Sequence, residues 1–491
     1  MRVLFVYPHT LGHGDVPIAL TVLSAVLRRA GHQVKVFDCS FYANNDYVRS
    51  MKELCGMVRP APKPPIEAPS AKGLVDLRQD FAVIVKAFNP HIVGVTCSTA
   101  IYPLGLECAQ IAKMIDSGVK TIFGGVHPTL CPEEVIPEEV VDFVCVGEGE
   151  EALVELCDVL EQKKPVRNIR NIWLKDPDNP GQIISNEPRP FLNMNTLPVQ
   201  DYQDFAQYSL YRPFDGKIYK MLHTEFSRGC VFNCFYCANH ALREMLKSFG
   251  RYHRCKDPAV TVEHIKELVQ KYEFNFIRIW DEDFTGHPVE YLKAIAVLYK
   301  KEIGLPFLVY ADTRSVTEEK VMILKDMGCV TMAIGIGSGS YWMRRYVLNR
   351  NITNEEIILK FEIAKKSGIR ISTYNMIGLP FETREMVFET IRLNRQVDVA
   401  TSTVGPFKPF PKTRLGDIAR QFGMIMRKPD FLTLESEMCT PYIDDKEIDG
   451  LVRTFAYYLK VPEHMFPILE LCEKDEKLAE QLLPHLKIEG I

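Results

Sequence analysis

Three cysteines stand close together near the middle of the chain, in the segment CVFNCFYC. Cys230, Cys234 and Cys237 follow C-x3-C-x2-C spacing, and no fourth cysteine lies nearby. Thiolates hold iron–sulfur clusters, and a site ligated by four protein side chains is closed. Three thiolates therefore predict a [4Fe-4S] cluster with one iron open to a small molecule. A zinc site is the alternative interpretation, and His240 is then the best fourth ligand.

The other cysteines give no such signal. Eleven are scattered along the chain, mostly in apolar sequence, where a free cysteine packs as a small hydrophobe. The N-terminus lacks the apolar core and cleavage site of a signal peptide, and no apolar run approaches the roughly 18 residues of a membrane span. We therefore expect a cytoplasmic protein with reduced thiols and no transmembrane segment.

Length and composition are those of an ordinary globular protein. The chain has 491 residues, of which 46% are hydrophobic and 25% are charged, and its formal net charge is −4. This length predicts two or three domains. The nearly neutral charge gives no reason to expect nucleic acid or an anionic membrane as the main partner.

Apolar strands alternate with helical patterns in the first 165 residues. The strand candidates are residues 3–7, 33–38, 92–96, 121–124 and 143–146. This alternation predicts a Rossmann-like, doubly wound parallel sheet with right-handed crossovers.

The loops that follow these strands combine glycines with small polar residues. Ligands of such sheets bind beyond the carboxyl ends of the strands, where glycines let the backbone approach closely. The candidate binding residues are Ser98, Thr99, Gly124, Gly125, His127, Thr129, Gly147 and Glu148. Several such loops on one edge favour a large flat ligand over simple tight turns. No G-x-G-x-x-G fingerprint follows the first strand, which argues against NAD or FAD.

Two segments interrupt this pattern. Residues 58–73 contain five prolines and predict an irregular surface excursion, with a gate over the ligand as the alternative. Residues 166–219 are rich in Pro, Asn and Asp and predict a linker with a small hairpin near 172–184.

Residues 220–411 repeat a strand and a helix about six times and predict a partial (β/α)6 barrel. The first strand is expected at 224–227. Reactive residues of such barrels lie at the carboxyl ends of the strands. Those positions hold Asp281, Asp283, Arg314, Gly335, Ser338, Met376, Ile377 and Gly378. The acidic pair can hold an ammonium group or cap a helix, and Arg314 can pair with a carboxylate. Residues 412–491 predict a small helical C-terminal domain that covers the barrel mouth.

The segment SRGCVFNCFYCAN at 227–239 resembles the cluster loop of radical S-adenosylmethionine (SAM) enzymes. Most of the chain is similar to the cobalamin-binding (class B type) members of that family. The matching segments are PIALTVLSAVLRRAGHQVKVFD, GGVHPTLCPEEV, FVCVGEGEEAL, IWDEDFTGHP, MAIGIGSGS, MIGLPFETREM and PFKPFP. The resemblance implies that the three cysteines hold the cluster and that its open iron chelates SAM. Tyr236 and residues 376–378 would contact adenine, Gly335 and Ser338 the ribose side, and Asp281 and Asp283 the methionine amino group. The N-terminal loop residues would line cobalamin.

The resemblance also implies a reaction. A 5′-deoxyadenosyl radical and methylcobalamin would methylate an unactivated carbon, or a phosphinate phosphorus, of a small metabolite, lipid or peptide. A reductant such as flavodoxin or ferredoxin would supply electrons. The alternatives are a radical oxidative cyclase, dehydratase or rearrangement enzyme without methyl transfer, whose first domain has lost cobalamin, and a non-catalytic cobalamin or iron sensor.

The chain departs from the family pattern at a few positions. Gly337 stands where many relatives have Glu, and Lys412 stands where the related proline motif often has Gly. The sequence contains no D-x-H-x-x-G motif, so a histidine below the cobalt is not expected. His9, His13 and His127 are expected to donate or accept hydrogen bonds rather than to bind cobalt.

Overall fold

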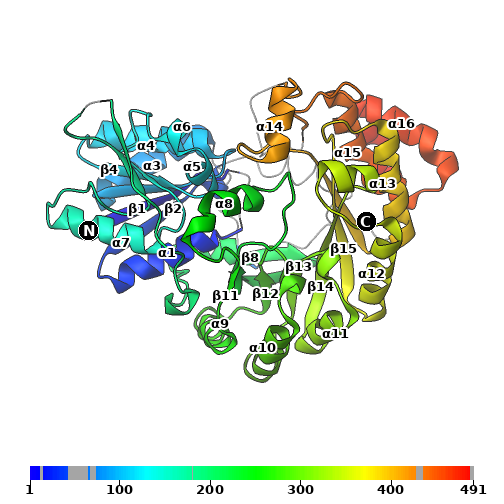
Figure 1. The fold of residues 1–491 in the computed structure, drawn as a ribbon, viewed down its shortest axis with the longest axis horizontal. Helices are drawn as coiled ribbons and strands as arrows, with labels where there is room; N and C mark the ends of the chain where they lie inside the picture. Colours follow the sequence, from blue (N-terminus) through cyan, green and yellow to red (C-terminus); the bar gives the residue numbers. More distant parts are fainter. Residues whose placement is uncertain (11–14, 43–64, 67–72, 180, 427–434, 487–491) are drawn as a thin grey trace. The chain divides into compact units, whose positions relative to one another are not determined.

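The structure is a computed structural model that describes the chain except residues 11–14, 43–64, 67–72, 180, 427–434 and 487–491. The described residues form two compact units (Figure 1). The first contains Met1–Asn45, Pro64–Arg212 and Ala241–Lys256, and the second contains Pro213–His240 and Asp257–Ile491. The proline-rich segment 58–73 lies largely outside the described residues.

The first unit is built on a sheet of seven strands in the order β2-β1-β3-β4-β5-β6-β7. Its strands are β1 (Arg2–Tyr7), β2 (Gln33–Asp38), β3 (Ile92–Thr96), β4 (Lys120–Gly124), β5 (Phe143–Cys145), β6 (Ile172–Lys175) and β7 (Ile183–Ser185). Strands β1 to β5 run parallel. The predicted hairpin is β6–β7, and it extends this sheet in the antiparallel direction from β5.

Helices cover this sheet as the alternation predicts. They are α1 (Ile18–Arg29), α3 (Leu74–Phe88), α4 (Tyr102–Ile115), α5 (Val126–Leu130), α6 (Pro132–Val135) and α7 (Glu150–Glu161). Val3, Leu4 and Val6 of β1 have no exposed surface, because helices pack on both faces of a doubly wound sheet. The order of the strands reverses between β1 and β3, which is where such folds bind ligands.

The second unit is a sheet of seven strands in the order β16-β15-β14-β13-β12-β9-β8. Its strands are β8 (Tyr211–Phe214), β9 (Lys217–Thr224), β12 (Phe276–Ile279), β13 (Phe307–Asp312), β14 (Cys329–Gly337), β15 (Arg370–Ile377) and β16 (Thr401–Pro406). From β9 to β16 all neighbours pair in parallel. The predicted fold class, a Rossmann-like sheet followed by a partial barrel and helices, is confirmed.

One predicted strand is wrong. The first parallel strand of the barrel is β9, which ends at Thr224, whereas the sequence predicted residues 224–227. Lys217, Lys220 and His223 interrupt the apolar pattern of β9, so its periodicity is weak. The outer helices of this unit are α9 (Pro258–Tyr272), α10 (Val289–Glu302), α11 (Glu318–Met327), α12 (Asn354–Lys366) and α13 (Arg384–Val397), and several lie along the outside of the sheet (Figure 1).

The C-terminal part is helical, as predicted. It contains α14 (Arg414–Gln421), α15 (Asp445–Lys460), α16 (Phe466–Lys474) and α17 (Glu476–Leu482). Ile448, Leu451 and Phe455 of α15 share one buried core with Ile377 and Leu379 at the end of β15. This core fixes the C-terminal helices against the carboxyl end of the barrel strands.

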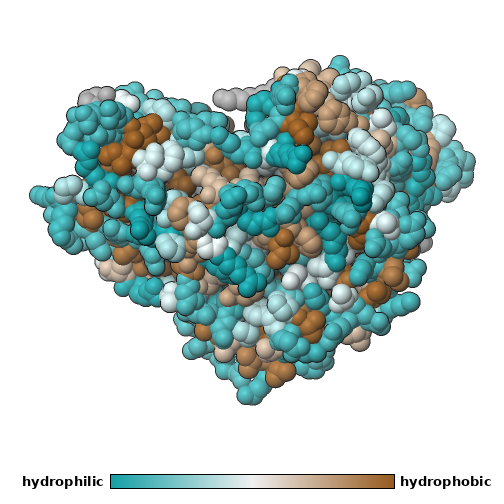
Figure 2. All heavy atoms as spheres, in the orientation of Figure 1, coloured by the Kyte–Doolittle hydropathy of each residue, from teal (hydrophilic) through white to brown (hydrophobic). Residues whose placement is uncertain are grey.

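Figure 2 shows a face that is mostly hydrophilic, with hydrophobic residues in scattered patches. In the part of the chain that the structure describes, no helix is both long and apolar enough to cross a membrane.

Candidate cluster and cofactor site

The three cysteines of the motif lie together in a loop that follows β9. Cys234 is buried, and Cys230 and Cys237 are partly buried. Burial raises the pKa of Cys230 to about 12 and that of Cys237 to about 11; neighbouring negative charge, including that of Cys237 on Cys230 and of Cys234 on Cys237, also raises both. Thiolates gathered in such a place are stable only opposite metal cations. The donor set therefore fits an iron–sulfur cluster.

The chain holds the cysteine loop through its backbone. Phe235 donates to the Leu348 carbonyl at 3.2 Å and accepts from the Leu415 amide at 2.9 Å. The Asn349 side-chain amide donates to the Asn233 carbonyl at 2.7 Å. The Phe232 amide points at Cys230 Sγ, 3.4 Å away. The loop is thus fixed by segments that are distant in sequence, and its shape does not depend on the thiols alone.

A buried charge cluster stands beside Cys234. Arg314 Nε and Arg350 Nη1 each lie within 3 Å of Asp312, at 2.8 and 2.9 Å. Arg314 Nη2 also donates to Cys234 Sγ at 3.2 Å, and its guanidinium lies 3.7 Å from the centre of the Phe232 ring. Arg314, predicted to meet a ligand carboxylate, is therefore already paired with Asp312 and donates to Cys234, a candidate cluster ligand.

We expect Arg314→Met to lower the reduction potential of the bound cluster. The variant removes a positive charge and a hydrogen bond to sulfur, and both stabilise the more negative, reduced state. The expected shift is on the order of 50 mV, close to a tenfold change in a one-electron equilibrium. Potentiometry followed by electron paramagnetic resonance measures it, with the exposed Arg345→Gln as the control. An unchanged potential would show that this contact does not reach the cluster.

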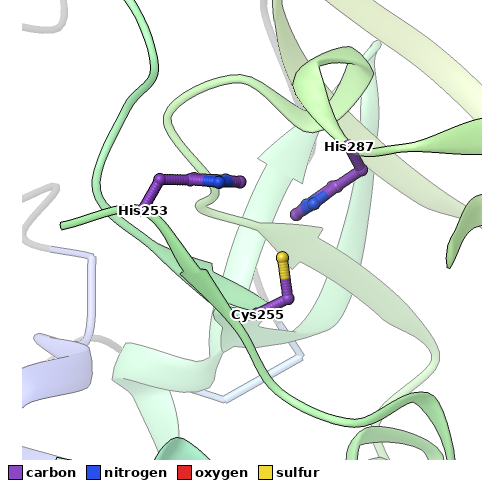
Figure 3. A group of neighbouring side chains, drawn as sticks. All are labelled: His253, Cys255 and His287. Carbon is purple, nitrogen blue, oxygen red and sulfur yellow. The ribbon is translucent and has the colours of Figure 1, made fainter. Parts of the chain in front are cut away.

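Asp281 is saturated by the protein itself. Its Oδ1 accepts from the amides of Phe226 and Ser227 at 2.7 and 3.1 Å, and its Oδ2 lies 2.7 Å from both Ser227 Oγ and His287 Nε2. A carboxylate offers about four acceptor sites, so none remains for a ligand. Asp281 thus anchors the entrance to the cysteine loop. His287, which lies 2.7 Å from Asp281, stands in the family-like segment IWDEDFTGHP but was not singled out as a site residue. Figure 3 labels this residue together with His253 and Cys255, which belong to the first unit.

Asp283 is in a different situation. Its Oδ1 accepts from Asp312 N, Ser315 Oγ and Thr285 Oγ1 at 2.8–3.0 Å, whereas its buried Oδ2 has no partner in the described structure. Burial raises the pKa of this carboxyl, which also adds to the negative charge near Cys230. A buried carboxylate oxygen without a partner is costly unless a ligand satisfies it. Of the two aspartates, Asp283 fits the ammonium group of SAM.

The predicted adenine and ribose positions divide into two groups. The Gly335 carbonyl accepts from Thr313 Oγ1 and from Arg350 Nη2, both at 2.7 Å, and Arg350 Nη1 donates to Tyr236 Oη at 3.1 Å. Ser338 is fully buried and its hydroxyl contacts the Ser340 amide and Thr390, so it acts inside the fold. Arg350 was missed in the sequence, although it connects Tyr236, Gly335 and Asp312.

Residues Met376, Ile377 and Gly378 form the end of β15 and the turn after it. Ile377 is buried in the core shared with the C-terminal helices, and Met376 packs at its edge. Gly378 has φ +74°, and a Cβ there would lie 2.8 Å from Ile448 of α15. Only glycine fits that position, which leaves the backbone groups of this turn at the barrel mouth.

Glu382 holds the same turn and was not singled out from the sequence. Its Oε2 accepts from the Leu379 amide at 3.2 Å, while Oε1 is buried without a partner in the described structure. Burial raises the pKa of this carboxyl from 4.5 to about 8, although hydrogen bonds from Leu379 and Gly378 oppose that shift.

We expect the folded protein to lose stability as the pH rises from about 4.5 to 8 partly because of Glu382. In this range the unfolded chain releases a proton that the folded chain keeps, so the stability present below pH 4.5 declines up to the folded pKa. Glu382→Gln should make the melting temperature less dependent on pH between pH 5.5 and 8, whereas Glu385→Gln, at an exposed position, should leave that dependence unchanged. If the melting temperatures of wild type and Glu382→Gln changed with pH by the same amount, this role of Glu382 would be refuted.

Both departures from the family pattern occupy left-handed backbone. Gly337 has φ +82°, and Lys412 has φ +58°. Glycine adopts this region freely, whereas a lysine does so at a cost of order 1 kcal/mol. A Cβ at Gly337 would lie 3.8 Å from Arg350 Nε, so the glycine leaves room beside that guanidinium.

The candidate cobalamin loops meet at the carboxyl edge of the first sheet. Gly125 has φ +103°, and a Cβ there would lie 2.7 Å from the Cys97 carbonyl, so this glycine is required by the chain itself. The Gly147 amide donates to Thr129 Oγ1 at 3.1 Å. Glu148 pairs with Arg254 at 2.7 Å and accepts from Leu192 N at 3.0 Å. These residues shape the edge rather than leaving polar groups for a ligand.

Two polar atoms at this edge are better suited to a ligand. His127 Nδ1 contacts Thr99 Oγ1 at 3.3 Å, while its Nε2 is buried without a partner in the described structure, as is the hydroxyl of Tyr102. The two rings lie 4.6 Å apart, and burial lowers the pKa of His127, which favours neutral imidazole. Ser98 and Gly124 lie partly exposed on the same loops, and His13 lies outside the described residues. These orphaned groups fit a large polar cofactor.

Two family models match different parts of the chain. The Radical SAM superfamily matches residues 224–393, and the B12 binding domain matches residues 67–157. A protein of Pyrococcus horikoshii described as an uncharacterized methyltransferase is 28% identical over 78% of this chain and 81% of its own length. An anaerobic magnesium-protoporphyrin IX monomethyl ester cyclase of Rubrivivax gelatinosus is 23% identical over 71% of this chain and 61% of its own.

Two solved structures share the fold. The radical SAM methyltransferase TsrM of Kitasatospora setae, with tryptophan and a SAM analogue bound, superposes with a TM-score of 0.64 at 16% identity, over 87% of this chain and 77% of its own. The cobalamin-dependent radical SAM enzyme OxsB, with aqua-cobalamin and SAM bound, gives a TM-score of 0.66 at 16% identity, over 99% of this chain and 71% of its own.

Proposed function

We propose that this chain, a cobalamin-binding radical SAM enzyme and a probable methyltransferase by its relatives, methylates an unactivated carbon of a small metabolite, lipid or peptide. The observation that carries the proposal is that one chain contains both a three-cysteine loop, in its second unit, and a sheet edge of the B12-binding type, in its first. When bound, the cluster and SAM supply a 5′-deoxyadenosyl radical and cobalamin supplies the methyl group.

The chain's own residues have separable tasks in this proposal. Cys230, Cys234 and Cys237 would hold the cluster, and Asp283 Oδ2 would accept from the methionine ammonium group of SAM. Arg350 would hold the Tyr236 ring and the Gly335 backbone on the side that the adenosine occupies. In the first unit, His127 and Tyr102 would offer polar atoms to cobalamin. A substrate would then be fixed in a site from which water is excluded, as a reactive radical demands.

A second candidate is a radical cyclisation without methyl transfer. It is favoured by the 23% identity to the Rubrivivax gelatinosus cyclase across 71% of this chain. Both candidates need a cytoplasm with a low-potential reductant such as flavodoxin or ferredoxin, since oxygen destroys exposed clusters.

Product analysis tests the proposal. The protein is reconstituted anaerobically with iron, sulfide and cobalamin, reduced, and supplied with SAM and cell extract. A methylase yields both 5′-deoxyadenosine and S-adenosylhomocysteine, and SAM with a deuterated methyl group labels the product. 5′-Deoxyadenosine without S-adenosylhomocysteine favours the cyclisation, and the absence of both contradicts either function.

A further inference from the structure

The barrel sheet has two faces of different character. On the face that helices such as α11 to α13 cover, Ile277, Val309 and Ile334 have no exposed surface. Side chains on the other face, here called the inner face, alternate with them. Arg278 and Tyr310 on the inner face keep part of their surface exposed, and Tyr374 exposes 41%. The inner face is therefore accessible, unlike the packed outer face.

Aromatic rings gather on one half of the inner face. Trp280 and Tyr310 have centroids 5.3 Å apart with only 23° between their planes, and His223 lies 6.0 Å from Trp280 at 27°. Tyr374 extends the group, with its centroid 6.0 Å from that of Tyr310. We call these residues, His223, Trp280, Tyr310 and Tyr374, the ring shelf. Trp280 and Tyr310 are nearly parallel and partly exposed, whereas His223 is fully buried and supports Trp280 from behind.

The ring shelf is held rigidly from one side. The Arg278 guanidinium lies 4.0 Å from the Trp280 centroid and 5.5 Å from that of Tyr310, and its Nε donates to Tyr310 Oη at 2.8 Å. Trp280 Nε1 donates to His223 Nδ1 at 2.9 Å. These polar contacts fix the orientation of the rings before any ligand arrives, which lowers the entropic cost of binding.

The other half of the inner face is lined by small residues. Ala333 pairs with both Tyr310 and Ser372 across the neighbouring strands, and Tyr374 pairs with Thr403. A Cβ added at Gly405 would meet no atom within 4 Å. Below the ring shelf, Met221, Phe276 and Leu308 close the sheet with a small apolar cluster. Flat rings thus border an open space that ends on an apolar base.

We propose that the inner face is the substrate pocket and that it selects substrates with a flat aromatic or conjugated ring, which stacks on the exposed part of the ring shelf at Tyr374. The inference rests on the proposed function, because it names the substrate class of that reaction. Aromatic rings gain from offset stacking on other rings beyond their buried area. Rings that merely filled the barrel would be buried, yet Tyr374 is well exposed and Gly405 borders open space.

A matched pair of probes tests the pocket by calorimetry on the reconstituted, SAM-loaded protein. 2-Naphthoate is flat, and decahydro-2-naphthoate has the same carbon skeleton and charge with saturated rings. We expect the flat probe to bind about tenfold more tightly than the saturated probe, because this ratio corresponds to about one stacking contact. Tyr374→Ala should remove most of that preference. Tyr374→Phe should retain it, and Tyr442→Ala, with 60% exposure away from the barrel strands, should change nothing.

Equal affinities for the two probes, no binding of the flat probe, or an unchanged preference in Tyr374→Ala would overturn the proposal. The melting temperature of each variant establishes that it is folded, and Tyr374→Phe, which removes only the hydroxyl of a side chain that is 41% exposed, should melt like wild type. Cleavage of SAM by the wild-type protein is measured separately. A wild type that cleaves SAM but shows no preference for the flat probe would refute this inference alone, whereas a wild type that does not cleave SAM would refute the proposed function.

Discussion

Replacing any one of Cys230, Cys234 or Cys237 with alanine is expected to abolish cluster assembly and to reduce SAM cleavage to background. Each thiolate would hold one iron of the proposed cluster, and the loop offers no spare sulfur ligand among its described residues. The fold should survive, because the loop is held by backbone hydrogen bonds with Leu348 and Leu415 and by the side-chain amide of Asn349. Iron and sulfide content, the absorbance of the cluster and 5′-deoxyadenosine formation measure the effect.

A matched control separates loss of the cluster from general damage. Cys439 is partly exposed and lies outside the loop, so Cys439→Ala should retain the cluster and its activity. The melting temperatures of the metal-free variants should stay near that of the metal-free wild type. SAM cleavage that persisted in a triple alanine variant would refute the radical mechanism outright.

The sequence predicts the backbone of this protein better than its polar contacts. Strand–helix alternation predicts both sheets, because each parallel strand is followed by a helix that packs on the sheet. The central strands of the first sheet are mostly apolar because they are covered on both faces. The cysteine spacing predicts a cluster loop for a local reason, since all three candidate ligands lie within eight residues. The bounds of β9 were not predicted because its lysines and histidine interrupt the apolar pattern, whereas in the structure its pairing with β12 and β8 defines it.

Contacts between distant segments could not be predicted in the same way. Asp281 and Asp283 are two residues apart and chemically identical, yet one is saturated by Ser227 and His287 while the other keeps an orphaned oxygen. Arg350 acts on Asp312 and Tyr236, which are far from it in sequence. Such roles depend on the packing of several elements, so no local spacing pattern in a single sequence predicts them.

Asp312→Asn is expected to destabilise the folded protein by about 3–5 kcal/mol, the usual cost of removing one partner from a buried ion pair. Burial opposes the ionisation of Asp312, but Arg350 and Arg314 hold the pKa of this carboxyl below its usual range. Asparagine preserves the shape and removes the charge, so two guanidinium groups are left buried without their shared carboxylate. Denaturant unfolding, or melting temperature where unfolding is irreversible, measures the loss.

Two comparisons decide whether the charge itself is responsible. Asp417→Asn breaks an exposed ion pair with Arg420, with more than half of each side chain in solvent, and should cost no more than about 1 kcal/mol. Adding Arg314→Met to Asp312→Asn should cost less than the sum of the single changes, because it removes one stranded cation. The folded pKa of Asp312 is depressed, so the stability that this carboxylate contributes is present above pH 3.8 and disappears as the pH falls through the folded pKa. The difference in unfolding free energy between wild type and Asp312→Asn should therefore become smaller in acid. If the stability difference between wild type and Asp312→Asn did not change with pH, and if the two substitutions had additive effects in the double variant, then packing rather than charge would maintain this cluster beside Cys234.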